Sequence, residues 1–345
     1  MVVESKNSSL AKARDAKQDE FYTQLSDIEK ELKHYKKHFK GKVVYCNCDD
    51  PRVSGFFHYF SYNFEKLGLK KLITTCYKST ERDLFSSNDA EAAIMLEYTG
   101  DKDGNNVPDP SEIGIVKLKG DGDFRSEESI ELLKQADIVV TNPPFSLFRE
   151  FITQIFEYDK KFIVVGSKNA ITYKEIFGLI KDNRMWLGNG FSAGNAYFKI
   201  PPENARNFAN GVYDKTTGLV KFRNVGWFTN LDIAKRHEDL ILFKNYTPEE
   251  YPTYDNYDAI EVSETKDIPV DYYGAMGVPI TFLDKYNPMQ FEILGITDRD
   301  NNSGLKTKEY TPADAKNHSD LNRRGSIKID NEYKSTYARL LIKRK

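Results

Sequence analysis

The sequence predicts an α/β protein with a doubly wound, mostly parallel sheet, followed by an α+β extension. Two observations support this fold class. From residue 42 to about residue 180, short β-branched apolar runs alternate with stretches of helical spacing. Beyond about Phe191, the pattern weakens into short strands and turns rich in Tyr, Asp and Pro. Repeated strand, loop and helix units place helices on both faces of a mostly parallel sheet.

The elements of the sheet domain follow one another closely. A capping-box pattern at Ser26 to Glu29 begins a helix that runs to Gly41. Strands are then predicted at 42–48, 71–77, 137–141 and 161–167, and helices at 54–68, 126–135, 146–158 and about 173–180. AIMLEY and IGIVKL form either a hairpin or two separate strands. We divide the chain into a flexible arm at 1–18, a sheet domain at 19–190 and an extension at 191–345.

Length and composition exclude several classes of protein. The 345 residues suit one large domain with an extension, or two domains, at roughly 150 residues per domain. No apolar run approaches the roughly 18 residues of a membrane span, and the N-terminus lacks the apolar core of a secretory signal. We therefore expect a cytoplasmic protein without membrane association.

Charge and cysteine content limit the kinds of site. The net charge of -2 gives no global attraction to nucleic acid, so phosphate binding needs a local patch. The stretch from Lys33 to Lys42 is one candidate, and a solvated helix face is the alternative. Cys46, Cys48 and Cys76 cannot form a disulfide framework, and no His or Cys cluster completes a metal site, so we interpret them as structural thiols.

Three unusual loops are predicted at one edge of the sheet. They are Asp49 to Pro51 after the first strand, Gly120 to Phe124 before a helix, and Asn142 to Phe145 after a buried strand. Ligands of open parallel sheets bind at the carboxyl ends of the strands. The shared position of the three loops therefore predicts a single site.

The Asn142-Pro143-Pro144-Phe145 loop is the most specific signal in the chain. Its prolines supply no N–H donors, so the loop offers acceptors, namely the Asn142 side-chain oxygen and the Pro143 carbonyl. Two acceptors suit a planar NH2 group, whose lone pair they free for attack on an electrophilic carbon, and Phe145 could stack on the attached ring. An ordinary Asn-Pro turn is the alternative.

The Gly-Asp-Gly-Asp-Phe loop and the Asp50-Pro51 pair carry less specific signals. Asp123 can accept a hydrogen bond from an exocyclic amine, and Phe124 can pack on a purine ring. A metal loop is the alternative, but the ligand spacing of a calcium loop is absent. Asp50 and Pro51 either hold an ammonium group or end a strand, and Gly55 would allow close approach to a ligand.

These motifs, in this order, resemble those of amino-methyltransferases that use S-adenosylmethionine. The stretches DEFYTQ, VVYCNCDDPRVSGFF, GDGDFRS and DIVVTNPPFSLFRE closely resemble EcoRI-type adenine-N6 DNA methyltransferases, from about residue 17 to residue 295 and again in YARLLIK. The resemblance implies a Rossmann-like methyltransferase sheet, with residues 19–190 as the catalytic domain and 191–345 as a DNA target recognition extension.

The resemblance also implies a role for each motif. Phe21, Tyr22 and Thr23, together with Asp50, Pro51 and Gly55, would hold the methionine end of the cofactor. Asp123 and Phe124 would hold its adenine, while the loop from Asn142 through Pro143 and Pro144 to Phe145 would position the target adenine. Phe198 is a candidate for the second face of the target base, with a core role as the alternative.

Two departures from the wider superfamily stand out. The glycine-rich turn after the first strand is reduced to Asp-Asp-Pro-Arg-Val-Ser-Gly. The second strand ends at Cys76-Tyr77-Lys78, where many relatives carry an acid for the ribose hydroxyls, so no ribose ligand is assigned.

We therefore expect a monomeric enzyme that needs no metal. It would methylate N6 of an adenine flipped out of double-stranded DNA, with S-adenosylmethionine as donor, in a restriction-modification type of system. A cognate restriction endonuclease, where one exists, would act separately. The alternatives are methylation of RNA adenine or of a protein glutamine, and an inactive methyltransferase-like DNA-binding protein.

Overall fold

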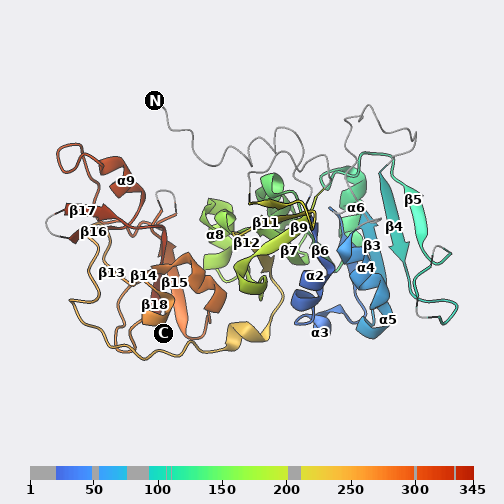
Figure 1. Cartoon of the computed structure of the whole chain (residues 1–345), viewed down its shortest axis with the longest axis horizontal. Coiled ribbons are helices and arrows are strands. Elements are labelled where there is room, and N and C mark those ends of the chain that lie inside the picture. Colours follow the sequence, from blue (N-terminus) through green and yellow to red (C-terminus); the bar gives the residue numbers. More distant parts are fainter. Residues whose placement is uncertain are drawn as a thin grey trace. The chain divides into compact units, whose positions relative to one another are not determined.

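The computed structural model describes residues 21–48, 54–75, 93–105, 107–109, 111–200, 211–298, 301–329 and 332–345. The chain divides into two units (Figure 1). The first contains the described residues up to Lys168 together with Gly188–Leu231, and the second contains Asn169–Leu187 and Asp232–Lys345. The predicted mixed α/β architecture is confirmed. Among the described helices, none has the length and apolar character needed to cross a membrane.

A large mixed sheet forms the centre of the first unit. Its strands there are β2 (Val43–Cys46), β3 (Lys71–Thr75), β4 (Ile94–Tyr98), β5 (Gly114–Lys117), β6 (Ile138–Thr141), β7 (Lys161–Ser167) and β12 (Val225–Thr229). They lie in the order β5-β4-β3-β2-β6-β7-β12. The four middle strands are parallel, whereas β4, β5 and β12 are antiparallel to their neighbours. The sheet is thus less parallel than predicted, and of the two readings left open for β4 and β5, the antiparallel hairpin is the observed one.

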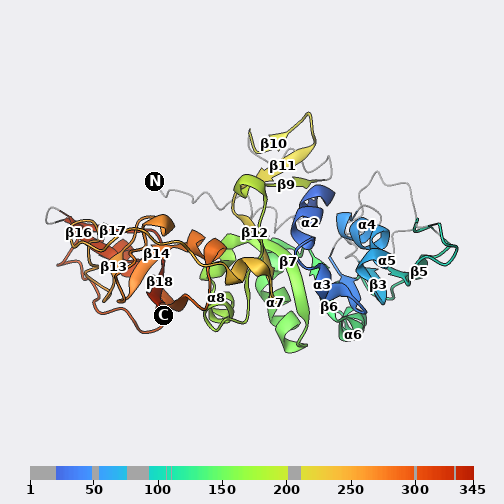
Figure 2. The ribbon, with the colours of Figure 1, turned by 90° about the horizontal axis from the view of Figure 1, so that it is seen from below.

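Helices cover both faces of this sheet. Figure 2 shows α4 (Gly55–Tyr62) and α5 (Phe64–Leu67) on one face, and α6 (Glu127–Gln135) and α7 (Phe148–Glu157) on the other. Both α4 and α6 begin where a serine hydroxyl accepts hydrogen bonds from backbone N–H groups, Ser54 for α4 and Ser126 for α6. These helices agree closely with the predicted ranges.

The first predicted helix is shorter than expected. It is observed as α2 (Leu25–Leu32) and α3 (Lys36–Phe39), with a break between them where Tyr35 is fully buried. The predicted capping box is wrong, because Gln24 occupies the cap position and makes no side-chain cap bond.

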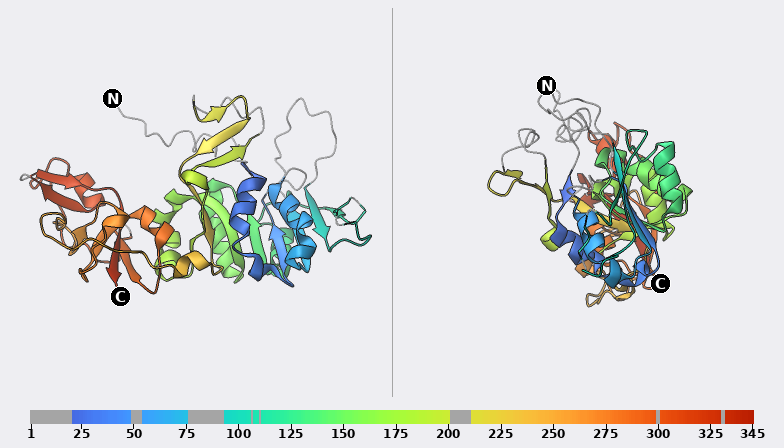
Figure 3. Two further views of the ribbon diagram at one scale, coloured as in Figure 1. Left: turned by 60° about the horizontal axis from the view of Figure 1, so that its bottom comes forward. Right: turned by 90° about the vertical axis from the view of Figure 1, so that its right-hand side faces the viewer.

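A small antiparallel sheet completes the first unit. It consists of β1 (Tyr22–Thr23), β9 (Ala196–Lys199), β10 (Tyr213–Asp214) and β11 (Leu219–Phe222), in the order β1-β9-β11-β10. Figure 3 shows this sheet standing away from the large one. Residues 188–231 therefore fold with the first unit, although we had assigned most of them to the extension. The functional division of the chain stays a prediction, and its arm at 1–18 lies outside the described residues.

The second unit has its own sheets and core. Its elements are α8 (Lys174–Lys181), β8 (Trp186–Leu187), β13 (Ile260–Glu261), β14 (Met276–Pro279), β15 (Phe291–Ile296), α9 (His318–Arg323), β16 (Ser326–Ile329), β17 (Glu332–Ser335) and β18 (Arg339–Arg344). The sheet order is β13-β14-β18-β15, and β16 pairs with β17. Tyr254, Tyr257 and Leu341 form part of its apolar core.

Candidate functional site

The carboxyl ends of β2 and β6 lie side by side. The two strands are parallel neighbours, and all four residues of each are buried. Just beyond them, the backbone N–H of Cys48 donates to the Thr141 hydroxyl over 3.1 Å. The loops that follow these strands therefore start at one edge of the sheet, as predicted. Asp50 and Pro51 lie outside the described residues, as does Cys76. Cys46 and Cys48 are free thiols.

The Asn142 side chain follows β6 directly and has a fixed orientation. It is 6 % exposed, and its Nδ2 donates a hydrogen bond to the backbone carbonyl of Phe21. Within the described part of the chain, its Oδ1 has no hydrogen-bond partner. Since an unpaired buried polar atom costs about 1–3 kcal/mol, this oxygen is expected to accept a hydrogen bond from a ligand.

Phe145 belongs to a cluster of four phenylalanines, which we call the phenylalanine cluster (Phe21, Phe145, Phe198 and Phe222). The Phe145 ring centroid lies 5.6 Å from that of Phe21, 6.2 Å from Phe198 and 6.3 Å from Phe222. Phe198 is completely buried and Phe145 is half-buried. The burial of Phe198 supports its core role, whereas Phe145 keeps part of its surface exposed.

The predicted cofactor segment Phe21 to Thr23 packs against the start of α4. A Cβ atom added to Gly55 would lie 2.9 Å from the Thr23 carbonyl oxygen and 2.8 Å from Ile28 Cδ1. Gly55 therefore permits close approach of β1, a protein segment, where we had expected approach of a ligand. The Thr23 hydroxyl is buried and, among the described residues, has no partner. It is a second polar atom whose bonding a ligand could complete.

The Asp123 carboxylate is held by its neighbour Arg125. It accepts hydrogen bonds from the Arg125 backbone N–H (2.8 Å), Nε (2.9 Å) and Nη2 (2.7 Å). Burial raises the pKa of Asp123, but the hydrogen bonds and charge of Arg125 outweigh burial and bring this pKa below its usual value. Asp123 is therefore an ionised acceptor at neutral pH. Asp121 accepts from the Asp123 backbone N–H over 3.0 Å, which is a turn-forming contact.

Helix α7 supports this loop through two residues that the sequence analysis missed. The Glu150 carboxylate binds Arg125 Nη1 at 3.0 Å, and Gln154 Nε2 donates to the carbonyl of Phe124 over 3.1 Å. The Phe124 ring packs edge-on against Phe151, with centroids 5.2 Å apart. Because Glu150 and Gln154 are four residues apart on the helix that follows the Asn142 loop, helical spacing was the available signal. Helix α7 thus connects the loop of Asn142 with the loop of Asp123.

The candidate phosphate patch lies at the opposite edge of the sheet. Helix α3 precedes β2, and Lys42 pairs at 3.5 Å with Asp137, which precedes β6. Lys36, Lys37 and Lys40 are exposed while Phe39 is buried. This arrangement is typical of a solvated helix face, and it places these lysines away from the carboxyl ends of the strands.

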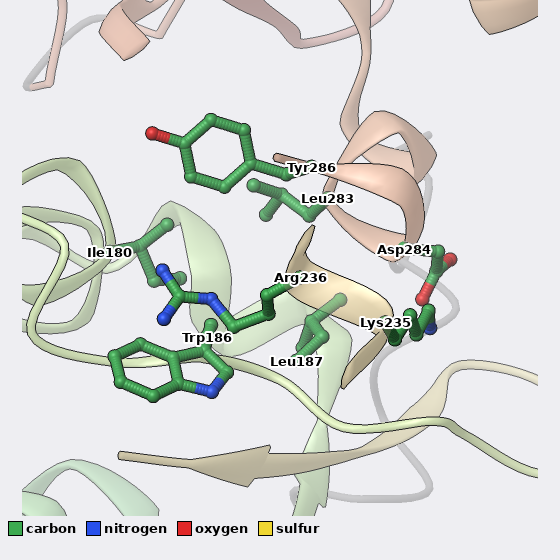
Figure 4. Close-up of a pocket in the computed structure, with 8 residues that line it drawn as sticks. All are labelled: Ile180, Trp186, Leu187, Lys235, Arg236, Leu283, Asp284 and Tyr286. Carbon is green, nitrogen blue, oxygen red and sulfur yellow. The ribbon is translucent and has the colours of Figure 1, made fainter. Parts of the chain in front are cut away.

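The second unit contains a small pocket that is separate from these loops. It is lined by Ile180, Trp186, Leu187, Lys235, Arg236, Leu283, Asp284 and Tyr286 (Figure 4). The Arg236 guanidinium carbon lies 3.5 Å from the centroid of the Trp186 ring, and its Nη2 donates to Asn183. Burial lowers the pKa of Arg236. The stacked pair fixes the 3-10 turn Ala234–His237 within this unit.

Comparisons with known proteins place the chain among the adenine-specific methyltransferases. The family described as "Adenine-specific methyltransferase EcoRI" matches residues 9–345. The Type II methyltransferase M.EcoRI of Escherichia coli is 51 % identical over 302 residues, which cover 85 % of this chain and 92 % of that protein. The chain belongs to this family, and it is an adenine-specific methyltransferase.

Two mycoplasma proteins are also similar to the chain. M.MgeORF184P of Mycoplasma genitalium is 42 % identical over 295 residues, and M.MpnI of Mycoplasma pneumoniae is 39 % identical over 293 residues. Each match covers 82 % of this chain and 84 % of the relative, and both relatives are named Type II methyltransferases. No solved structure matches the chain at a significant level.

Proposed function

We propose that the protein transfers a methyl group from S-adenosylmethionine to N6 of an adenine flipped out of double-stranded DNA, at a specific site and as part of a restriction-modification type of system. The observation that carries this proposal is the buried Asn142 amide, whose NH2 group is bonded to Phe21 while its oxygen is unpaired. Membership of the adenine-specific family supports adenine as the acceptor.

The target amine would be positioned by two acceptors. Its two hydrogens would be donated to Asn142 Oδ1 and to the Pro143 carbonyl, and Pro144 fixes the backbone between them and the stacking ring of Phe145. Bonding both hydrogens turns the nitrogen lone pair toward the methyl group, and the N6 proton released after transfer passes to water. S-adenosylmethionine, when bound, supplies a methyl group already activated by its sulfonium charge, so alignment matters more than a strong base.

The residues present fit the cofactor. Asp123 is ionised, and each carboxylate oxygen has two acceptor sites, so it can take a hydrogen bond from the cofactor's adenine amine in addition to those from Arg125. Phe124 would pack on the adenine ring. Phe21, Tyr22 and Thr23, with Asp50 and Pro51, would hold the methionine end, and the unpaired Thr23 hydroxyl supports this assignment. Gly55 contributes by letting this segment lie close to α4.

The remaining assignments follow from this activity. Residues 19–190 would form the catalytic domain with a doubly wound, Rossmann-like sheet, residues 191–345 would recognise the DNA target, and 1–18 would be a flexible arm. The enzyme would act in the cytoplasm as a monomer, separately from any cognate endonuclease. Phe145 would stack on the flipped base, with Phe198 behind it in the core.

Expression in a methylation-free host tests the proposal directly. Mapping of modified bases should find N6-methyladenine within one short DNA sequence and nowhere else. Transfer of labelled methyl groups to RNA or to a protein glutamine, with unmodified DNA, would replace the proposed acceptor. Purified protein that binds no S-adenosylmethionine would instead identify an inactive DNA-binding relative.

A further inference from the structure

We propose that the outer face of the small sheet binds the DNA phosphates next to the flipped adenine. The outer face consists of Tyr22, Tyr197, Lys199 and Lys221. This inference rests on the proposed function, and it assigns to the first unit a DNA contact that we had expected from the extension.

The strand register separates the two faces of the sheet. Tyr22 is paired with Lys199, and Tyr197 is paired with Lys221. Because successive side chains of a strand point to opposite faces, these residues lie on the side opposite Phe198. The inner face carries Phe198 and Phe222, whose rings contact Phe145. The outer face is therefore one sheet layer away from the ring that we expect to stack on the target base.

Charge and exposure on the outer face suit a polyanion. Tyr197 is 39 % exposed, Lys199 is exposed, and Lys221 Nζ lies 5.8 Å from the Tyr197 ring centroid. Within the described residues, neither Lys199 nor Lys221 has an ion-pair partner. Two unpaired cations beside an exposed aromatic ring can bind phosphate oxygens without breaking an existing contact.

The acidic residue of the small sheet does not neutralise these lysines. Asp214 pairs with Leu219 on β11, and Leu219 pairs with Lys199 on β9, so Asp214 and Lys199 are two strand spacings apart, roughly 10 Å. The Asp214 carboxylate already accepts from the Thr216 backbone N–H over 2.8 Å. The positive charge of Lys199 and Lys221 therefore remains available.

Location distinguishes this face from the lysines of α3. An adenine held beside Phe145 has its own sugar-phosphate backbone immediately outside the pocket, and phosphate contacts fix the register of a protein on DNA. The small sheet is at the carboxyl edge, through the contacts of Phe21 with Asn142 and Phe145. Helix α3 is at the amino edge, so its exposed lysines provide a matched control.

Two double variants test the proposal. Lys199→Gln/Lys221→Gln removes both outer-face charges, and Lys36→Gln/Lys37→Gln removes two charges from α3. Affinity for a duplex containing the mapped target site is measured by fluorescence anisotropy between 50 and 200 mM salt. Each lost phosphate contact should reduce the salt slope by about 0.9, so the outer-face variant should lose affinity about 12-fold less than wild type across this range.

The controls separate the two proposals. The α3 variant should keep the wild-type slope, and Lys199→Arg/Lys221→Arg should restore it. Unchanged S-adenosylmethionine affinity in calorimetry would show that the outer-face variant is folded. A wild-type slope in that folded variant, or an equal reduction in both glutamine variants, would overturn this inference even if the wild type methylates DNA. A wild type that methylates no DNA would overturn the proposed function.

Discussion

The Asn142 side chain donates a hydrogen bond to the backbone carbonyl of Phe21, a residue 121 positions earlier in the chain. This bond joins the loop expected to hold the target adenine to the segment expected to hold the cofactor. It also decides which end of the amide is available, because the NH2 group is used and only the oxygen is left. Displacement of Phe21 should therefore disturb the chemistry as well as cofactor binding.

The Asn142→Asp variant tests this orientation. The new carboxylate would point one oxygen at the Phe21 carbonyl, so burial and lone-pair repulsion should raise its pKa above the usual value for Asp. Only the protonated form can donate to Phe21 and restore the wild-type geometry. The single-turnover methylation rate of the variant should therefore be highest at low pH and fall about tenfold for each unit above that pKa. The variant must be compared with wild type at each pH, and a ratio independent of pH would refute the idea.

Removal of the amide should affect chemistry more than binding. Asn142→Ala is expected to lower the single-turnover rate by orders of magnitude and leave S-adenosylmethionine affinity nearly intact, because the lost bond forms with the target amine. Quenched-flow methylation assays and calorimetry provide the two readouts. Full methylation of duplex DNA by this variant would rule out the amine-positioning mechanism.

Replacement of Phe145 by Ala should weaken retention of the flipped base. The change removes a stacking surface worth about 1–3 kcal/mol per base. A 2-aminopurine at the target position should brighten with wild type, and the signal should change more in Phe145→Ala than in Asn142→Ala. Equal signals from the two variants would argue against stacking by Phe145.

The Gly55→Ala variant should weaken cofactor binding through the protein backbone. Its Cβ would meet the Thr23 carbonyl at 2.9 Å, so β1 must move, at a cost of about 1–3 kcal/mol in stability. Denaturant unfolding and calorimetry with S-adenosylmethionine measure the two effects. Gly178→Ala is the matched control, because no atom lies within 4 Å of the new Cβ and a helical Ala should add about 0.4–1 kcal/mol.

The Asp123→Ala variant should reduce S-adenosylmethionine affinity by about 1–3 kcal/mol through loss of one hydrogen bond. The pKa of Asp123 is lowered, so in wild type this contribution should be complete at neutral pH and be lost only as pH falls below the usual range for Asp. Calorimetry between pH 5 and 8 should therefore show no titration of this contact. Unchanged affinity in the variant would remove Asp123 from the cofactor site.

Breaking the buried ion pair of the second unit should destabilise the protein. Arg339 Nη2 and Nε lie 2.6 and 2.9 Å from Glu261 Oε1, and Glu261 is 5 % exposed. Glu261→Ala leaves a buried guanidinium unpaired, at a cost of about 3–5 kcal/mol. The exposed pair of Lys266 with Glu264 provides the control, and Glu264→Ala should hardly change the unfolding midpoint. Equal midpoints for the two variants would contradict this reasoning.

Sequence patterns predicted the large sheet well and the small sheet not at all. Strands β2 and β6 were found within one or two residues of their bounds, because each is an unbroken apolar run between polar loops. The small sheet joins two-residue and four-residue strands that are far apart in the sequence. Such strands are too short for a periodic signal, and long-range pairing leaves no local pattern.

The candidate site was predicted as a set of motifs without their connections. The loop containing Asn142 could be recognised because it is rich in proline and placed after a buried strand. Its bond to Phe21 uses a backbone carbonyl, which every residue has, so composition carries no trace of it. The break at Tyr35 was missed for a related reason, since helix propensity there is overruled by burial of the ring.

The alternation of the chain between its two units has a consequence for synthesis on the ribosome. The chain leaves the first unit after Lys168, returns at Gly188 and leaves again after Leu231. Strand β7 ends at Ser167, but its antiparallel partner β12 is complete only at Thr229. At 5–20 residues per second, the nascent chain holds β7 with an open edge for about 3–12 s. A gene split anywhere between these strands yields two fragments, and neither of them encodes a complete unit.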